Sequence, residues 1–261
     1  MNPRTVKGMA DLLLPFAVVD DGIVLQRDGS LLAAWEFRGP DAIASSPDEI
    51  MAHAERANQA FQLGSGWMFQ CDVIRSATRE YLPPASFPDP ISELVDEERR
   101  QQFEQAGARF ETEYFLTLTH LPPHQSEERL RGFVFDGAAA REGTAERTLD
   151  MFRERVEGFE RLFGALVSLR QLKSRVVVDD LGYSWTADDL LQFLRRTISG
   201  ANHPFRQPEI PIQLNEILAV DLVTGVAPVV DGQHTRVVSI DGFPPMSVSY
   251  THLTLPTICS V

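Results

Sequence analysis

Two histidines, His120 and His124, are the first residues whose types and spacing could carry chemistry. A spacing of four residues lets two imidazoles share a metal ion when both lie on one face of a helix. Pro122 and Pro123 stand between them and exclude such a helix, so we expect the pair in a loop that faces solvent. No cysteine or further histidine is close in the sequence, and a metal site is not predicted.

Paired carboxylates are the second candidate, because two of them that converge on a pocket can act as general acid and base. Asp179 and Asp180 follow a predicted strand, whereas Asp188 and Asp189 fall in the first turn of a predicted helix. Carboxylates there interact favourably with the helix dipole. We therefore expect structural roles for both pairs, and a turn position for His203.

Lysine chemistry has only two candidates, Lys7 and Lys173. Lys173 precedes Ser174, as the lysine of a phosphate-binding loop precedes Ser or Thr. That loop also needs glycine where Leu172 and Val167 stand, and the long predicted helix runs through the pair. A nucleotide site of this type is therefore not expected in the chain.

The two cysteines, Cys71 and Cys259, are too few for a secreted disulfide framework and indicate a reducing compartment. Cys71 alternates within a predicted strand, so a buried structural thiol is expected rather than a nucleophile. The predictions thus name no catalytic, cofactor-binding or metal-ligating residue.

The composition is that of a folded chain of 261 residues, with 43% hydrophobic and 23% charged residues. Its formal net charge of −13 disfavours binding to a phosphate backbone. The apolar run 12–19 contains Pro15 and is too short for the roughly 20 residues of a membrane-spanning helix. It is either a buried N-terminal segment or a peripheral contact with a membrane or partner.

The elements that must position these residues are mixed, which predicts the α+β class with largely antiparallel hairpins and strands. A hairpin is expected over 22–37, with Asp28 and Gly29 as a two-residue turn. A helix is expected to start at the capping box of Ser46 and Glu49 and to end at Gly64. Further expected elements are strands at 66–75, 110–123, 175–180 and 233–240, and helices at 91–106 and from a Thr186 cap to Gly200.

One long amphipathic helix is predicted over residues 145–172. Its apolar residues recur in steps of three and four, which places them on one helix face. They are Leu149, Phe152, Val156, Phe159, Phe163, Leu166 and Leu169.

Five segments in this order resemble the N-terminal region of the TrbE/CagE/VirB-type ATPases of conjugation and type IV secretion. They are LLLPFAVVDDGIVLQRDGSLLAAWEFRGPD (12–41), LGSGW (63–67), FETEYFLTLTHLPP (110–123), NHPFRQPEIPIQLNEIL (202–218) and HTRVVSIDGFPP (234–245). The hairpin with DDG and DG, the ETEYFLTLTHLPP strand and RVVSIDGFP are the most specific. The resemblance covers roughly residues 10–245.

This resemblance implies a docking and assembly domain that precedes a motor domain. ATP and Mg²⁺ are then expected in the full-length relatives and no cofactor in this chain, so that the chain itself is not an enzyme. The implied partners are inner-membrane components of a type IV secretion system and other subunits of the same ATPase. The implied location is cytoplasmic, peripheral to the bacterial inner membrane, with no direct contact to nucleic acid.

The domain assignment that follows is one assembly domain over 1–245, with possible subdomain boundaries near 76–90 or 136–146. From Ser247 the sequence SVSYTHLTLPTICSV resembles a translated assembly scar, so 246–261 is predicted to be a non-native tail, with a genuine edge strand as the alternative. Two other interpretations remain: a self-contained enzyme that uses His120 or the aspartate pairs, and a regulatory paralogue that lacks the motor.

Overall fold

The computed structural model describes residues 8–40, 45–78, 81, 87–105, 109–122, 142–179, 181–208 and 212–238. The chain divides into one compact unit that ends at Val220 and a second that begins at Asp221. The subdomain boundaries predicted near 76–90 or 136–146 are not tested by this division and stay predictions. The predicted tail, 246–261, lies outside the described residues.

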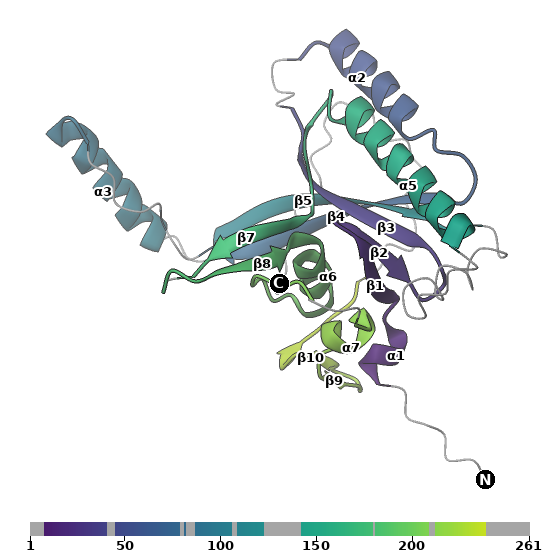
Figure 1. Cartoon of the computed structure of the whole chain (residues 1–261). Helices are drawn as coiled ribbons and strands as arrows, with labels where there is room; N and C mark the ends of the chain where they lie inside the picture. Colours follow the sequence, from purple (N-terminus) through teal and green to yellow (C-terminus); the bar gives the residue numbers. More distant parts are fainter. Residues whose placement is uncertain are drawn as a thin grey trace. The chain divides into compact units, whose positions relative to one another are not determined.

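An antiparallel sheet forms the centre of the first unit (Figure 1). Its strands lie in the order β1 (Pro15–Asp20), β2 (Ile23–Gln26), β3 (Leu31–Arg38), β5 (Arg109–His120) and β4 (Trp67–Thr78). A sixth strand, β6 (Ser168–Gln171), pairs with residues 35–38 of β3. Since β2 pairs only with the beginning of β3, β2 and β6 share one edge of that strand.

The predicted hairpin is present as β2 and β3. Leu25 pairs with Leu31, and the Gln26 amide donates to the Ser30 carbonyl at 2.8 Å. The turn therefore contains three residues rather than the predicted two, and its last residue, Gly29, has a φ of 85°. Glycine suits this position because side chains clash with the backbone at positive φ.

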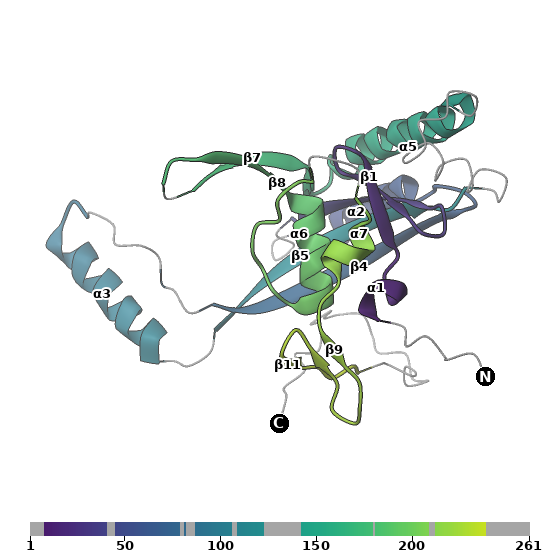
Figure 2. The same ribbon diagram turned by 60° about the horizontal axis from the view of Figure 1, so that its bottom comes forward.

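Alternate side chains of β3 point to opposite faces of the sheet, and both faces are covered. Leu31, Ala33 and Trp35 belong to one buried cluster, with α2 (Pro47–Ala60) and α5 (Glu142–Phe163). Leu32 and Ala34 belong to a second cluster, with α6 (Asp189–Ser199) and α7 (Leu214–Leu218). Figure 1 shows α2 and α5 on one side of the strands and α6 and α7 on the other, and in Figure 2 α6 and α7 have come to the front.

Trp35 anchors the first cluster. It is fully buried, and its ring lies 5.2 Å from that of Phe159 on α5. Its indole N–H donates to Glu160 Oε1 at 2.7 Å, so the one polar atom of the ring is satisfied. The apolar face of α5 that the sequence predicts, from Leu149 to Phe163, is buried in this cluster.

The predicted helix over 145–172 is wrong at its C-terminal end. Helix α5 ends at Phe163, and Ser168–Gln171 form β6 instead. Leu166 and Leu169 do continue the helical spacing, but residues 168–171 pair with β3, and the Leu172 amide donates to Ala34 at 2.9 Å. Pairing along the free half of β3 therefore prevails over the local pattern.

The remaining helices agree with the sequence in place and differ at their ends. Ser46 and Glu49 form the predicted capping box of α2, whose C-cap is Phe61 rather than the predicted Gly64. Asp188, not Thr186, caps α6, whereas Gly200 ends it in a left-handed conformation as predicted. α3 (Pro90–Gln105) has no buried residue, and α1 (Met9–Leu12) is a single turn.

The remaining described strands form two small sheets. β7 (Ser174–Val178) and β8 (Ser184–Asp188) form an antiparallel ribbon in the first unit. In the second unit, β9 (Leu222–Val223), β10 (Val229–Val230) and β11 (Gln233–His234) form a three-stranded sheet. The strand predicted over 233–240 is thus limited to its first two residues, because 235–238 are not extended partners of another strand and 239–240 lie outside the described residues. The α+β class with antiparallel sheets is confirmed.

The turn from β1 to β2 is tied to two other elements by the residues Asp20, Asp21 and Gly22. Asp20 Oδ2 accepts from Arg153 Nε of α5 at 2.6 Å, and Asp21 Oδ1 accepts from the Ser174 amide at 2.8 Å. Gly22 has a φ of 76°, and an added Cβ would lie 2.8 Å from the carbonyl oxygen of Leu172. The DDG sequence is therefore explained by the packing of this turn. Residues 15–20 are buried or half-buried in β1, as the buried interpretation of the apolar run expects, whereas Leu12 and Leu14 at its start are exposed.

Candidate functional site

His120 does not lie in a solvent-facing loop, and that prediction is wrong. The strand β5 extends up to His120, which is its last residue and pairs with Leu31 and Trp67. Its side chain is buried, and its ring lies 4.3 Å from that of Trp67. Its pKa is lowered, first by burial of the imidazole and second by the positive charge of Arg155.

No metal-binding group of three or more His, Cys, Asp or Glu side chains occurs among the residues that the structure describes. His120 lies beside Trp67, which itself stacks on Phe152 of the first cluster. Asp188 and Asp189 instead start α6 on the other face of the sheet. His124 lies outside the described residues. The histidine and the aspartates that an enzyme would combine are therefore not brought together.

Asp179 shapes the turn of the β7–β8 ribbon. Its Oδ1 accepts from the amides of Leu181 and Tyr183 at 3.0 and 2.8 Å, a bonding pattern that stabilises tight turns. Asp180 lies outside the described residues.

Asp188 caps α6 by accepting from the Leu191 amide at 3.0 Å. Its pKa is raised above the ordinary value, because burial disfavours the charged carboxylate. The amides of Leu191 and Leu190 act in the opposite direction, and the neighbouring carboxylates of Asp21 and Asp189 add to the increase.

Cys71 and His203 both lie at the surface. Cys71 is exposed on β4, so the prediction of a buried thiol is wrong. β4 is the last strand of the sheet, and its residues 68–71 are all exposed. Partial burial of the sulfur and the carboxylate of Asp72 raise the pKa of the Cys71 thiol. His203 is exposed in the segment that follows α6.

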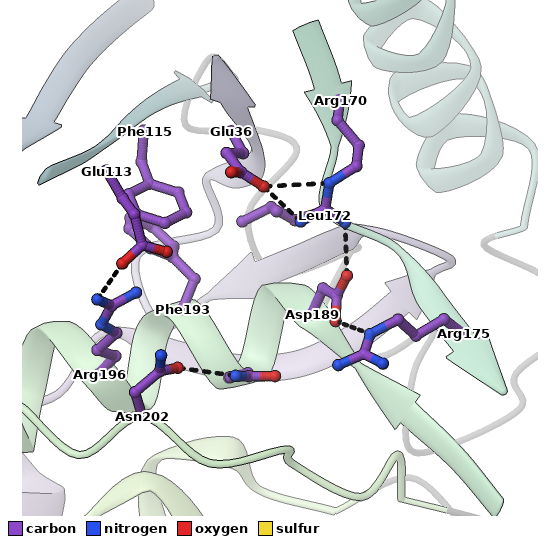
Figure 3. A pocket seen from close by; sticks show the side chains of 11 residues that line it. Glu36, Glu113, Phe115, Arg170, Leu172, Arg175, Asp189, Phe193, Arg196 and Asn202 are labelled. Atoms are coloured by element: carbon purple, nitrogen blue, oxygen red, sulfur yellow. Dashed lines mark hydrogen bonds and ion pairs between the residues drawn. The ribbon is translucent and has the colours of Figure 1, made fainter. Parts of the chain in front are cut away.

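A pocket of about 430 Å³ lies beneath the sheet, on the α6 side (Figure 3). Its lining comes from β3, β5, β6, β7 and α6, from Leu172 between β6 and β7, and from Asn202 after α6. Leu172, Phe115 and Phe193 provide its apolar part. The polar residues are Glu36, Glu113, Arg170, Arg175, Asp189, Gln192, Arg196 and Asn202.

Asp189 is the centre of an ion-pair network in this pocket. Its two oxygens accept from Arg170 Nη1 and Arg175 Nε, each at 2.6 Å. Arg170 also donates to Glu36 Oε2 from Nη2 at 2.6 Å and from Nε at 3.1 Å. The pKa of Arg170 is raised: burial lowers it, but the hydrogen bonds with Glu36 and Asp189 outweigh that effect. The network joins β3, β6, β7 and α6.

Arg196 lies at the other end of the pocket (Figure 3). Its side chain is only 4% exposed, and its Nη2 donates to Glu113 and, at 2.9 Å, to the Ser76 hydroxyl. Its buried Nε has no hydrogen-bond partner among the described residues. Gln192 and Asn202, whose amides bond to each other at 2.8 Å, complete the polar rim.

These pocket residues were not predicted from the sequence, apart from Asp189. One signal was available in the sequence: Glu113 lies two residues before Phe115 in a strand, so both side chains point to the same face of the sheet. Nothing in the local sequence links them to Arg170 or Arg196, because those residues meet only through strand pairing and helix packing.

Comparisons with known proteins decide the family. Residues 22–128 match the family described as type IV secretion system ATPase VirB4/TrbE, N-terminal domain. A probable conjugal transfer protein TrbE from Sinorhizobium fredii (strain NBRC 101917 / NGR234), the first of two TrbE segments in that organism, is 36% identical over 121 residues. These residues are 45% of this chain and 81% of that protein. The chain belongs to the TrbE family of conjugal transfer proteins.

A longer TrbE relative extends the similarity over most of the chain. The conjugal transfer protein TrbE of Rhizobium radiobacter is 35% identical over 242 residues, which are 90% of this chain. The chain spans only 29% of the length of that TrbE protein. The matched domain is the N-terminal domain of an ATPase family and not its motor domain.

At the one Lys-Ser/Thr pair of the sequence, Lys173 and Ser174, the described residues do not form a phosphate-binding loop. Lys173 lies between β6 and β7, and Ser174 is the first residue of β7. A phosphate-binding loop opens a helix, whose N-terminal amides hold the phosphates. The expectation that a helix runs through this pair is wrong. The pair is still unsuited to binding phosphate, because a strand and not a helix follows it.

No helix in the described part of this TrbE chain is long and apolar enough to cross a membrane.

Proposed function

We propose that this chain is the docking and assembly region of a TrbE-type ATPase that energises conjugal transfer through a type IV secretion system. The supporting observation is the 242-residue similarity to a TrbE protein of which the chain spans 29%, together with a match to an N-terminal domain. Nucleotide and Mg²⁺ then belong to a motor region of the whole protein, and this chain carries no catalytic residue and no cofactor.

The partners proposed are inner-membrane components of the secretion system and other copies of the same ATPase. Large apolar side chains outside both cores support an assembly role, since contiguous exposed apolar surface marks interaction sites. Such side chains occur on β4 and on the β7–β8 ribbon: Met68, Phe69, Val73, Val176, Val178, Leu181 and Tyr183. A net charge of −13 disfavours contact with nucleic acid, and the proposed location is cytoplasmic, peripheral to the inner membrane.

A competition experiment tests this proposal. The chain is overproduced with an affinity tag in Rhizobium radiobacter donor cells, whose TrbE is 35% identical to it. Because it would occupy docking positions without providing a motor, we expect the transfer frequency to fall by about tenfold or more. The resident TrbE, detected by antibody, is expected to co-purify with the tagged chain.

The control is the same overproduction in donors that use a conjugation system without a TrbE protein, where transfer stays at its normal level. An unchanged transfer frequency in the TrbE-dependent donors, with the chain accumulating and no TrbE recovered, would contradict the assembly role.

A further inference from the structure

The pocket beneath the sheet has the size and the mixed lining of a small-molecule site. Its volume of about 430 Å³ lies in the range of 300–1,000 Å³ that is usual for ligand pockets. Its lining combines an apolar part with a few polar groups that converge from different elements. Such a combination is the general pattern of a site that holds an apolar body and orients it by polar contacts.

Two phenylalanines form the apolar part. The rings of Phe115 and Phe193 are stacked with centroids 4.7 Å apart, and Leu172 lies beside them in the pocket lining. All three side chains are held by the second buried cluster, so this surface is fixed by the core of the fold. An apolar ligand group placed here gains burial without any need to order the side chains first.

Two arginines of the pocket lining have guanidinium nitrogens that bond to no other described residue. Arg175 uses only its Nε, towards Asp189, so its two terminal nitrogens are available within the described part of the structure. Arg196 uses only Nη2, although its side chain is almost completely buried. Figure 3 shows the two guanidinium groups at opposite sides of the pocket, with Asn202 and the amide bonded to it between them.

We propose that this pocket binds a small organic acid, with its carboxylate or phosphate at Arg175 and its apolar body against Phe115 and Phe193, towards Arg196. The anionic group accepts hydrogen bonds from the terminal nitrogens of Arg175, and charge-assisted hydrogen bonds are the strong ones.

The charge of the site favours a small anion over a polyanion. The three arginines of the lining are matched by Glu36, Glu113 and Asp189, so the pocket carries little net charge. The whole chain carries −13, which opposes any large anion at long range. Affinity must therefore come from short-range contacts with the donors and the phenylalanines, which only a small ligand inside the pocket can make.

Calorimetric titration of the chain with phenyl phosphate, benzoate, inorganic phosphate and phenol tests this assignment. We expect saturable binding of phenyl phosphate or benzoate, with a dissociation constant roughly tenfold below that of inorganic phosphate because the ring is buried. Phenol, which lacks the anion, is expected not to saturate. The side-chain Nε–H resonances of Arg175 and Arg196, followed by NMR, should shift with the same saturation curve.

Three variants distinguish this pocket from binding elsewhere. Arg175→Gln removes two donors at a half-exposed side chain, and Asn202→Asp adds a carboxylate at an exposed position while keeping the oxygen that accepts from Gln192. Both are expected to weaken binding by about fivefold or more. Arg161→Gln, on exposed α5 surface, is the matched control and should bind as the parent chain does. Equal affinity for inorganic phosphate, or unchanged binding in Asn202→Asp, would overturn the assignment.

Discussion

Two adjacent carboxylates at the start of α6 have different environments. Asp189 is held between the guanidinium groups of Arg170 and Arg175, each at 2.6 Å. Asp188 instead accepts an amide of its own helix, and burial raises its pKa. Asp188 therefore caps the helix, and the free-energy cost of burying its charged carboxylate depends on pH. Asp189 instead connects α6 to two strands.

The effect of pH on Asp188 has a definite sign. Above the ordinary pKa of 3.8 the unfolded chain loses this proton, while the folded chain still holds it because its pKa is raised. The folded state then binds more protons, so stability falls as pH rises through this window. Asp188→Asn keeps the cap oxygen and removes the charge, so we expect it to be at least as stable as the parent at pH 7. Urea unfolding should show this difference shrinking as the pH is lowered towards the ordinary pKa.

Asp188→Ala is the matched comparison, because it removes the cap oxygen as well. It should lose about 1 kcal/mol of unfolding free energy at pH 7, the usual value of an N-cap. A loss in Asp188→Asn as large as that in Asp188→Ala would show that the charge, not the cap oxygen, supports the helix.

Residue-level predictions from sequence succeeded where the cause is local. The Ser46 and Glu49 capping box and the Gly200 cap depend on backbone groups within four residues, and both are present. The burial of His120 and the exposure of Cys71 depend on which strands lie beside β5 and β4. Residue spacing does not show which strands will be neighbours or which strand will lie at the edge of the sheet. The predictions for His120 and Cys71 therefore both failed.

At the scale of elements, the β1–β2 turn and the link between β6 and β7 fit closely together. The Asp21 carboxylate accepts from the Ser174 amide, and Gly22 leaves room for the Leu172 carbonyl and the Lys173 side chain. The contact sets where β6 leaves the sheet edge that it shares with β2. It thereby positions Arg170 and Arg175 on either side of that link.

Gly22→Ala tests this contact. A Cβ there would meet the Leu172 oxygen at 2.8 Å, in addition to the strain of a φ of 76°. Gly64→Ala is the matched control, since Gly64 has a φ of 90° and nothing within 4 Å of an added Cβ. By urea unfolding we expect a loss of about 1 kcal/mol for Gly64→Ala and roughly 2–3 kcal/mol for Gly22→Ala. Equal losses would mean that the close approach contributes nothing.

Most helices and strands were predictable because the spacing of their apolar residues is clear. The main error, at the C-terminal end of the predicted helix 145–172, shows where such spacing is not sufficient. Leu166 and Leu169 fit a helix as well as a strand, since a short apolar run does not separate the two. The outcome was decided by β3, whose residues 35–38 have no other strand on that side in the described sheet. The pocket could not be predicted for the same reason, because Glu36 and Arg170 meet only through this pairing.

At the scale of the whole molecule, the sheet separates the groups that an enzyme would need together. His120 is packed with Trp67 on the side of α5, and the carboxylates of Asp188 and Asp189 start α6 on the other side. The pocket that the fold does form combines arginines with carboxylates already paired to them. The described fold therefore keeps these candidate acid and base groups apart.

Purified alone, the chain is expected to hydrolyse no ATP above the background of a protein-free control. The reason is that its single Lys-Ser/Thr pair, Lys173 and Ser174, joins two strands, so no helix N-terminus can hold the β- and γ-phosphates beside the lysine. Phosphate release is measured with Mg²⁺ and ATP for the parent chain and for Lys173→Ala. Lys173 is exposed, so the substitution leaves the fold intact and isolates the ammonium group. Turnover by the parent that disappears in Lys173→Ala would place nucleotide chemistry in this chain and contradict its assignment as an assembly region.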